Sequence, residues 1–268
     1  MERITSRQNP LVRRFRELAR DGSGDWMLLD GDHLVTEALD SAAVLDVVAF
    51  ADRLVHGRLT TLAARAQSAG ARAVTVPDAV LAAMSPVQQP SGVVAIARRS
   101  PATVADVLAR TPQLVLLLSD VQDPGNVGAI VRTAEACGAT GVAAGEACAD
   151  PFGWKALRGA MGSTFRLPVA ARQTLSTVMD QARTAGLRLF ATVPRGGTPL
   201  PECDLQAPCG ILLGGEGSGL PATLMDAHDG RMTIPMRPPV ESLNVAIAAA
   251  LILYEASAQR AARTAVHR

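Results

Sequence analysis

The sequence predicts two α/β domains joined by a short linker, and three observations lead to this fold class. Strand-like runs rich in Val, Ile and Leu alternate with helix-like stretches in both halves of the chain. Between the halves, residues 98–113 contain two prolines and several polar residues, as linkers often do. The chain has 268 residues, of which 48% are hydrophobic, so it is long enough for two cores and too apolar for disorder. We place the domains at residues 1–99 and 113–268, and the linker at residues 100–112.

The chain opens with a helix that has one basic face. Residues 1–20 hold six arginines against two glutamates, and Leu11, Val12, Phe15 and Leu18 recur among them at helical spacing. The basic face is either a solvated helix surface or a surface that contacts phosphates, and the pattern fits both. Further strand and helix signals then alternate. We expect strands at residues 26–30, 44–50, 71–77 and 92–97, and helices at 33–40 and 58–70.

The second domain repeats the alternation of strands and helices. Asn126 and Ser242 each stand at the start of a helical pattern and are candidate N-caps. We assign no element to the Arg- and Gly-rich segment 155–170. The apolar runs predict strands at 114–119, 141–144, 188–193 and 210–215. The helical patterns lie at 126–138, 174–186 and 243–260.

Two nucleotide-binding motifs and one hydrolase motif are excluded. Lys155 is the single lysine of the chain and lies in Gly-Trp-Lys-Ala-Leu, so there is no Walker A phosphate loop. The alternating glycines of residues 215–219 look like a Rossmann loop, but only 49 residues follow them, too few for the βα units that such a loop opens. The serine among these glycines also lacks the flanking glycines of a lipase nucleophile elbow. The glycines still predict a sharp turn and a close backbone approach.

The composition makes metal, membrane and secretion roles improbable. The four cysteines form no Cys-x-x-Cys pair and have no histidine at metal-ligand spacing, so we expect reduced thiols and no metal site. The longest apolar run, residues 243–254, has twelve residues, fewer than the ~20 that cross a bilayer. The first residues form no apolar signal segment. We therefore expect a soluble, cytoplasmic protein that has no membrane partner.

Three segments of the second domain, taken together, carry a resemblance to a known family. "NVGAIVRTAEACGA", "LLGGEGSGLP" and "IPM…SLNVAIAAALILYE", in this order and spacing, resemble the three signature motifs of the SpoU (TrmH-like) RNA methyltransferases of the SPOUT superfamily. The resemblance covers roughly residues 112–262. In the first domain, "ITSRQNPLVRRFRELA" and "LLDGDHLVTEAL" are similar to the opening of that family's substrate-binding domain, with Asp30 where the family more often has glutamate.

The resemblance implies a fold, a reaction and partners. Members of the family transfer a methyl group from S-adenosylmethionine to a ribose 2'-hydroxyl in rRNA or tRNA. Their catalytic domain is a parallel α/β sheet whose C-terminal segment forms a trefoil knot around a bent cofactor, and they act as homodimers. The N-terminal α/β domain would then bind structured RNA through its phosphates and 2'-hydroxyls. The arginines that we assign to this contact are Arg7, Arg13 and Arg14.

The resemblance also assigns the residues of the active site, position by position. One group, of apolar residues and glycines, would line the cofactor pocket: Gly214, Gly215, Ile234, Met236 and Leu243. A second group matches the polar catalytic positions of the family: Asn126, Arg132, Glu216, Ser242 and Asn244.

The chemistry of these side chains suggests their roles. A guanidinium stays charged at all ordinary pH values, so we expect Arg132 to hold a phosphate of the target nucleotide and to stabilise the developing alkoxide rather than to act as a base. Ser242 and Asn244 would orient the ribose or the cofactor. Glu216 would brace either Arg132 or its own loop.

Three alternatives to an rRNA methyltransferase remain open on the sequence. A tRNA substrate fits the same motifs, although an appended domain of this type often accompanies rRNA substrates in the family. An RNA-binding or ribosome-associated protein without catalysis is disfavoured because all five polar positions are present. A small-molecule methyltransferase would have no use for the N-terminal domain.

Overall fold

The computed structural model describes residues 1–22, 24–217, 219–225 and 228–266, and the chain divides into two compact units. The first unit comprises residues 1–100 together with residues 152–165. The second comprises residues 101–151 and 166–268. Residues 152–165, which the sequence analysis placed in the second domain, thus belong to the compact unit formed by the N-terminal residues.

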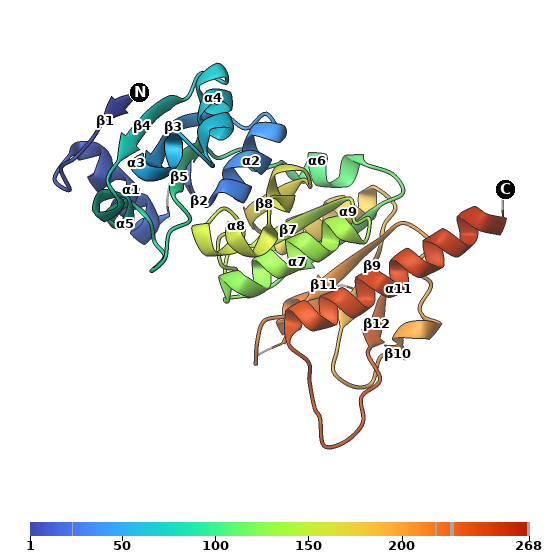
Figure 1. Ribbon diagram of the computed structural model, residues 1–268. Coiled ribbons are helices and arrows are strands. Elements are labelled where there is room, and N and C mark those ends of the chain that lie inside the picture. Colours follow the sequence, from blue (N-terminus) through green and yellow to red (C-terminus); the bar gives the residue numbers. More distant parts are fainter. Residues whose placement is uncertain (23, 218, 226–227, 267–268) are drawn as a thin grey trace. The chain divides into compact units, whose positions relative to one another are not determined.

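The first unit is built on a five-stranded mixed sheet (Figure 1). Three strands on one side are parallel, and the other two run antiparallel to their neighbours. The order across the sheet is β1 (Glu2–Arg3), β4 (Arg72–Val76), β3 (Leu45–Ala51), β5 (Val93–Arg98) and β2 (Trp26–Asp30). The four longer strands match the strands expected from the sequence to within two residues at each end.

Helices cover the sheet of the first unit and bury apolar side chains on it. Asn9 caps the first helix, because its Oδ1 accepts a hydrogen bond from the backbone N–H of Leu11 (2.9 Å), and Pro10 suits the first helical position. Phe15 and Met84 are fully buried where the first helix and the fifth meet the sheet. The helices are α1 (Pro10–Asp21), α2 (Asp32–Asp40), α3 (Asp52–Val55), α4 (Thr60–Ser68) and α5 (Asp78–Met84).

Two short elements from the middle of the sequence complete this unit. They are α8 (Trp154–Ala160) and the 3-10 helix η1 (Ser163–Phe165). The Trp154 ring packs against the core beneath α1, and its Nε1 donates a hydrogen bond to the carbonyl oxygen of Ala19 (3.1 Å). Arg158 lies 3.9 Å from the buried carboxylate of Asp30. These tertiary contacts stabilise a helix that is too short to be stable alone, which is why the sequence pattern did not predict it.

The second unit contains a seven-stranded sheet in which every pair of neighbours is parallel, as the resemblance implied. Its central strands read as unbroken apolar runs because helices cover both faces. The order is β10 (Thr198–Pro199), β12 (Gly230–Thr233), β9 (Arg188–Thr192), β11 (Cys209–Leu213), β6 (Leu114–Leu118), β7 (Gly141–Gly145) and β8 (Val169–Gln173).

The helices of the second unit lie on two faces. α6 (Val104–Ala109), α9 (Leu175–Thr184) and α10 (Ala222–Met225) pack against the face that presents Val115 and Leu117. α7 (Pro124–Ala136) and α11 (Val245–Val266) lie side by side on the other face (Figure 1). A short 3-10 helix, η2 (Leu200–Glu202), follows β10. α6 falls within the expected linker, where a capping box of Thr103 and Asp106 starts it.

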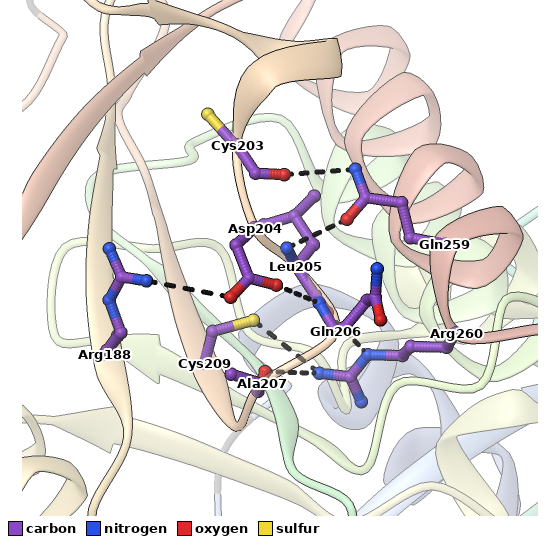
Figure 2. A network of polar contacts seen from close by, with 9 residues as sticks. All are labelled: Arg188, Cys203, Asp204, Leu205, Gln206, Ala207, Cys209, Gln259 and Arg260. Atoms are coloured by element: carbon purple, nitrogen blue, oxygen red, sulfur yellow. Dashed lines mark hydrogen bonds and ion pairs between the residues drawn. The ribbon is translucent and has the colours of Figure 1, made fainter. Parts of the chain in front are cut away.

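Polar contacts fasten the last helix to the loop that precedes β11 (Figure 2). The Arg260 guanidinium donates hydrogen bonds to the carbonyl oxygens of Leu205 (2.8 Å) and Ala207 (3.0 Å). Gln259 donates to the carbonyl oxygen of Cys203 (3.0 Å) and accepts from the N–H of Leu205 (3.0 Å). By length and composition alone, an 18-residue window of α11 could cross a membrane. These contacts and the packing against α7 instead hold the helix on its own sheet.

Candidate active site

A cavity of about 650 Å³ lies at the carboxyl ends of β9, β11 and β12 and under the start of α11. This volume is within the ~300–1,000 Å³ range of small-molecule sites, and the carboxyl ends of parallel strands are where such sites usually form. Its wall is largely apolar and includes Leu213, Met232 and Ile252. All five residues that the resemblance assigned to the cofactor pocket line it, namely Gly214, Gly215, Ile234, Met236 and Leu243.

The two glycines that follow β11 are required by close backbone crossings. A Cβ atom on Gly214 would lie 2.5 Å from the carbonyl carbon of Gly219, and one on Gly215 would overlap the carbonyl oxygen of Asp120. Asp120 itself has a left-handed backbone with φ 56°. No side chain fits at either glycine, so the chain can bend back here only as bare backbone. The floor of the cavity is therefore made of peptide groups.

Three polar side chains from distant parts of the sequence form a hydrogen-bonded chain beside the cavity. The Oδ1 of Asn244 accepts from the backbone N–H groups of Ala246 (2.9 Å) and Ile247 (3.3 Å) at the start of α11. The Nδ2 of Asn244 donates to the Oδ1 of Asn126 (3.1 Å), and the Nδ2 of Asn126 donates to Glu216. Backbone N–H groups only donate and a carboxylate only accepts, so both amides have one possible orientation.

The helix caps in this region differ from those expected. α7 begins at Pro124, and the carboxylate of Asp123 caps it by accepting from the N–H groups of Gly125 (2.6 Å) and Asn126 (3.2 Å). The prediction that Asn126 is an N-cap is therefore wrong, because an aspartate before a proline forms the better start. Its side chain is free to reach Glu216. Asn244, rather than Ser242, caps α11.

Ser242 lies two residues before Asn244, the N-cap of α11, and its exposed side chain lines the cavity. Within the described part of the chain, the hydroxyl of Ser242 forms no hydrogen bond. A hydroxyl on the rim that has not been used for capping is available to a ligand. Of the five polar positions, Glu216, Ser242 and Asn244 line the cavity directly, and Asn126 reaches it through Glu216.

Arg132 is placed differently from the other four. It is exposed on α7 and does not line the cavity of its own chain. Six residues separate it from Asn126, which at ~100° per residue puts the two side chains on different faces of the helix. Within the described ranges, no protein group forms a hydrogen bond or an ion pair with Arg132. Glu216 bonds to Asn126, so of the two roles expected for Glu216, bracing of Arg132 or of its own loop, the first does not occur within one chain.

The three arginines expected to contact RNA lie in the first unit. Arg7 and Arg13 are exposed, and the Nε of Arg7 donates to the carbonyl oxygen of Ala79 (3.0 Å). Arg14 is half-buried. It forms an ion pair with Asp46, and its guanidinium lies 5.0 Å from the centre of the Trp26 ring. Arg14 is thus held by the protein itself.

The thiols offer no reactive group. All four cysteines are free, and burial is the main cause that raises the pKa of Cys137, Cys148, Cys203 and Cys209. A raised pKa keeps a thiol protonated and unreactive at neutral pH. Among the described residues, no group of three or more His, Cys, Asp or Glu side chains could hold a metal ion.

One wall of the cavity consists of residues that were not predicted from the sequence to be part of the site. Thr192, Val193 and Pro194 line it at the end of β9, and Ala248 lines it from α11. The signal was partly available, because "RLFATV" was recognised as a strand. It could not be used without the strand order, which places β9 directly beside β11.

Two family models match this chain. The SpoU rRNA Methylase family matches residues 113–254, which is more than half of the chain. The family described as RNA 2'-O ribose methyltransferase substrate binding matches residues 28–102.

Relatives and solved structures match along nearly the whole length. A protein of Synechocystis sp. named as an uncharacterized tRNA/rRNA methyltransferase is 38% identical over 265 residues, which covers 96% of this chain and 94% of that protein. The 23S rRNA (guanosine(2553)-2'-O)-methyltransferase RlmP of Bacillus subtilis is 30% identical over 258 residues, with 95% and 98% covered. The AdoMet-bound rRNA methyltransferase from Sinorhizobium meliloti is 30% identical, has a TM-score of 0.84, and covers 95% of this chain and 97% of its own. This chain belongs to the SpoU rRNA methylase family.

Proposed function

We propose that this chain transfers the methyl group of S-adenosylmethionine to a ribose 2'-hydroxyl of ribosomal RNA. The observation that carries the proposal is the cavity at the strand ends, with its glycine floor and its hydrogen bonds from Asn244 to Asn126 and from Asn126 to Glu216, in a protein that matches both SpoU family models. The Bacillus subtilis relative is named for a 2'-O position in 23S rRNA, and the Sinorhizobium meliloti structure holds AdoMet. A tRNA remains the alternative substrate.

The cavity fits S-adenosylmethionine by its chemistry. Apolar side chains such as Ile234, Met236 and Leu243 suit the adenine ring, and the peptide groups at Gly214 and Gly215 suit its polar edges. The carboxylate of Glu216 lies in the same wall and suits a cationic sulfonium. When bound, the cofactor supplies an electrophilic methyl group.

The chain's own residues then position the hydroxyl and assist the loss of its proton, since the electrophile is already strong. Ser242, with its unused hydroxyl on the rim, orients the ribose. Hydrogen bonds that run from α11 through the side-chain amides of Asn244 and Asn126 fix Glu216 at the cavity. Arg132 stays a guanidinium and holds the phosphate of the target nucleotide, where it also stabilises the developing negative charge. The proton of the 2'-hydroxyl leaves through that phosphate or through water.

Arg132 does not line the cavity of its own chain, so in this proposal a second copy of the chain supplies it, and an apolar face beside it supports a homodimer. α11, the neighbour of α7, exposes Ile247, Leu251 and Tyr254 by 54%, 43% and 71%. Their spacing of four and three residues puts them on one face. Apolar side chains grouped in this way usually mark an interface. A second copy on the α7–α11 face would cover them and bring Arg132 to the partner's cavity.

The trefoil knot and the cytoplasmic location are parts of the same proposal. The close approach of Gly215 to the backbone of Asp120, 95 residues earlier in the sequence, supports a chain that is threaded closely past itself. A ribosomal substrate implies the cytoplasm.

The reaction is tested with labelled S-adenosylmethionine and unmodified transcripts of 23S rRNA and of tRNA. The expected result is label at one 2'-O position of the rRNA, mapped as resistance to alkaline cleavage. Label in tRNA alone would move the substrate to tRNA. Cofactor binding without label in either RNA would favour the non-catalytic alternative.

The shared site is tested by mixing two inactive variants. Arg132→Ala keeps the cavity but removes the guanidinium, whereas Ile234→Trp fills the cavity and keeps Arg132. If the arginine acts across a dimer, a purified mixed dimer of differently tagged chains has one complete site and recovers about half of the wild-type activity. If Arg132 acts in its own chain, the mixed dimer stays inactive. A monomer in light scattering would also refute the shared site.

A further inference from the structure

A group of arginines on the first unit lies outside both regions matched by the family models. The substrate-binding model begins at residue 28, whereas α1 ends at Asp21. Arg13 and Arg16 are three residues apart on α1, so they are neighbours on one face of the helix. Both are exposed, and Arg7 is exposed in the turn that precedes the helix. We call Arg7, Arg13 and Arg16 the α1 arginines.

Two of the α1 arginines are braced by the neighbouring helix. The Nε of Arg7 donates to the carbonyl oxygen of Ala79, and the Nε of Arg16 donates to that of Ala83, both at 3.0 Å. These carbonyls are four residues apart on α5, which separates the anchors by one turn, or ~6 Å. Ala83 is in the last turn of α5, where carbonyl groups have no helical partner, so the contact is stable.

The bracing uses only one nitrogen of each guanidinium. Among the described residues, no protein group accepts a hydrogen bond from the Nη atoms of Arg7 or Arg16, and the side chain of Arg13 forms no hydrogen bond or ion pair. Each guanidinium therefore keeps paired donors of the kind that bind phosphate oxygens in a bidentate way. Because the side chains of Arg7 and Arg16 are already fixed, less conformational entropy is lost when a phosphate binds.

Other arginines of the same unit have their charges compensated. Arg53, Arg65 and Arg72 form ion pairs with Asp78, Asp40 and Glu2 at distances between 2.5 and 2.8 Å. The α1 arginines have no such partner among the described residues. Glu17 is the acidic neighbour on α1, and it opposes the three positive charges with one negative charge. Three positive charges without an acidic partner among the described residues are therefore grouped on this face.

We propose that Arg7, Arg13 and Arg16 bind phosphates of the substrate RNA and extend its contact surface beyond the matched substrate-binding region. This inference rests on the proposed function. Contacts of this kind fix the position of an RNA but do not read its sequence. The α1 arginines therefore determine the affinity for RNA and its salt dependence, whereas methyl transfer on RNA that is already bound does not depend on them.

The test compares two triple variants of the full chain that lose the same charge. Arg7→Gln/Arg13→Gln/Arg16→Gln removes the α1 arginines, and Arg53→Gln/Arg65→Gln/Arg72→Gln removes paired ones. Dissociation constants for an unmodified 23S rRNA transcript are measured over a series of salt concentrations. Each phosphate contact contributes about 0.7–0.9 to the slope of log K against log salt, so the first variant lowers the slope by about two to three. The second leaves it near the wild-type value.

A single variant separates phosphate binding from a structural role. Arg13 braces nothing, so Arg13→Gln leaves the melting temperature unchanged and still lowers the slope by about one. If wild-type protein binds and methylates the transcript but both α1 variants keep its slope, the assignment of the α1 arginines is wrong. If wild-type protein neither binds nor methylates any RNA, the proposed function itself fails.

Discussion

Asn126 donates a side-chain hydrogen bond to Glu216, which lies 90 residues further along the chain. The same amide accepts from Asn244, 118 residues away, and so joins the three sequence motifs at one point. This series of hydrogen bonds begins at backbone N–H groups of α11. The positive end of that helix is therefore directed, through the side-chain amides of Asn244 and Asn126, toward the carboxylate of Glu216. This arrangement fixes the carboxylate of Glu216 beside the cavity.

Replacing Asn126 by aspartate tests this arrangement with almost no change in shape. Asn126→Asp places a second carboxylate against Glu216 and removes the donor, so the two groups repel each other. We expect kcat to fall by about 10²-fold, the usual effect of a displaced active-site group, with little change in melting temperature. Gln181→Glu, on the exposed surface of α9, adds the same charge away from the cavity and should leave kcat unchanged. Normal turnover by Asn126→Asp would show that the hydrogen bond has no role.

Asn244 has two functions that two substitutions separate. Its Oδ1 caps α11, and its Nδ2 holds Asn126. Asn244→Ala loses both, so we expect a loss of about 1 kcal/mol in the free energy of unfolding together with a loss of activity. Asn244→Asp retains the cap but not the donor, so it should keep its stability and still lose activity. An active Asn244→Asp protein would assign to Asn244 a capping role alone.

The parts that the sequence predicted well are those that depend on local pattern. The strand predicted for "WMLLD" has the same bounds as β2, and the strand predicted at 114–119 corresponds to β6. β12 and β8 were missed because they are short, lie near the edges of the sheet and mix polar with apolar residues. Their pairing with neighbouring strands stabilises them, and the sequence of one strand does not reveal this pairing.

The site could be predicted only in part. The resemblance identified residues such as Asn126 and Glu216, and the helical pattern identified the elements that carry them. Their mutual contact depends on β6 and β11 being neighbours, although 90 residues separate the two strands' loops. No periodicity encodes a strand order. For the same reason the position of Arg132, exposed on α7 away from the cavity, was not foreseen.

The α8 segment should stabilise the first unit although it lies in the middle of the sequence. Trp154→Ala removes a large ring from the edge of the core and should lower the free energy of unfolding by about 3 kcal/mol. Trp154→Phe keeps an aromatic ring and part of the packing but loses the hydrogen bond to Ala19, which contributes about 1 kcal/mol, so it should cost less than Trp154→Ala. Urea unfolding of both variants measures the two effects. Equal losses would mean that the hydrogen bond, and not packing, fixes the segment.

Asp30 and Asp106 should influence the pH dependence of stability in opposite directions. Burial raises the pKa of the Asp30 carboxyl above its ordinary value of 3.8, although a hydrogen bond from Ser85 and the charge of Arg158 act against this. Hydrogen bonds from the hydroxyl and the N–H of Thr103 hold the pKa of Asp106 below that value. The folded protein thus binds a proton at Asp30 more tightly than the unfolded chain does, and at Asp106 less tightly.

The sign of each effect follows from linkage between proton binding and folding. As pH rises from 3.8 through the raised pKa, the charged Asp30 destabilises the fold, so Asp30→Asn should gain stability relative to wild type over that window. Asp106 stabilises the fold above 3.8 and loses this contribution as pH falls through its lowered pKa, so Asp106→Asn should be the less stable protein at neutral pH and approach wild type in acid. Urea unfolding at a series of pH values measures the free energy of unfolding of each variant relative to wild type. The contributions of the other titrating groups cancel in these differences. If both variants changed the free energy of unfolding in the same direction, the assignment of burial to Asp30 and of capping to Asp106 would be contradicted.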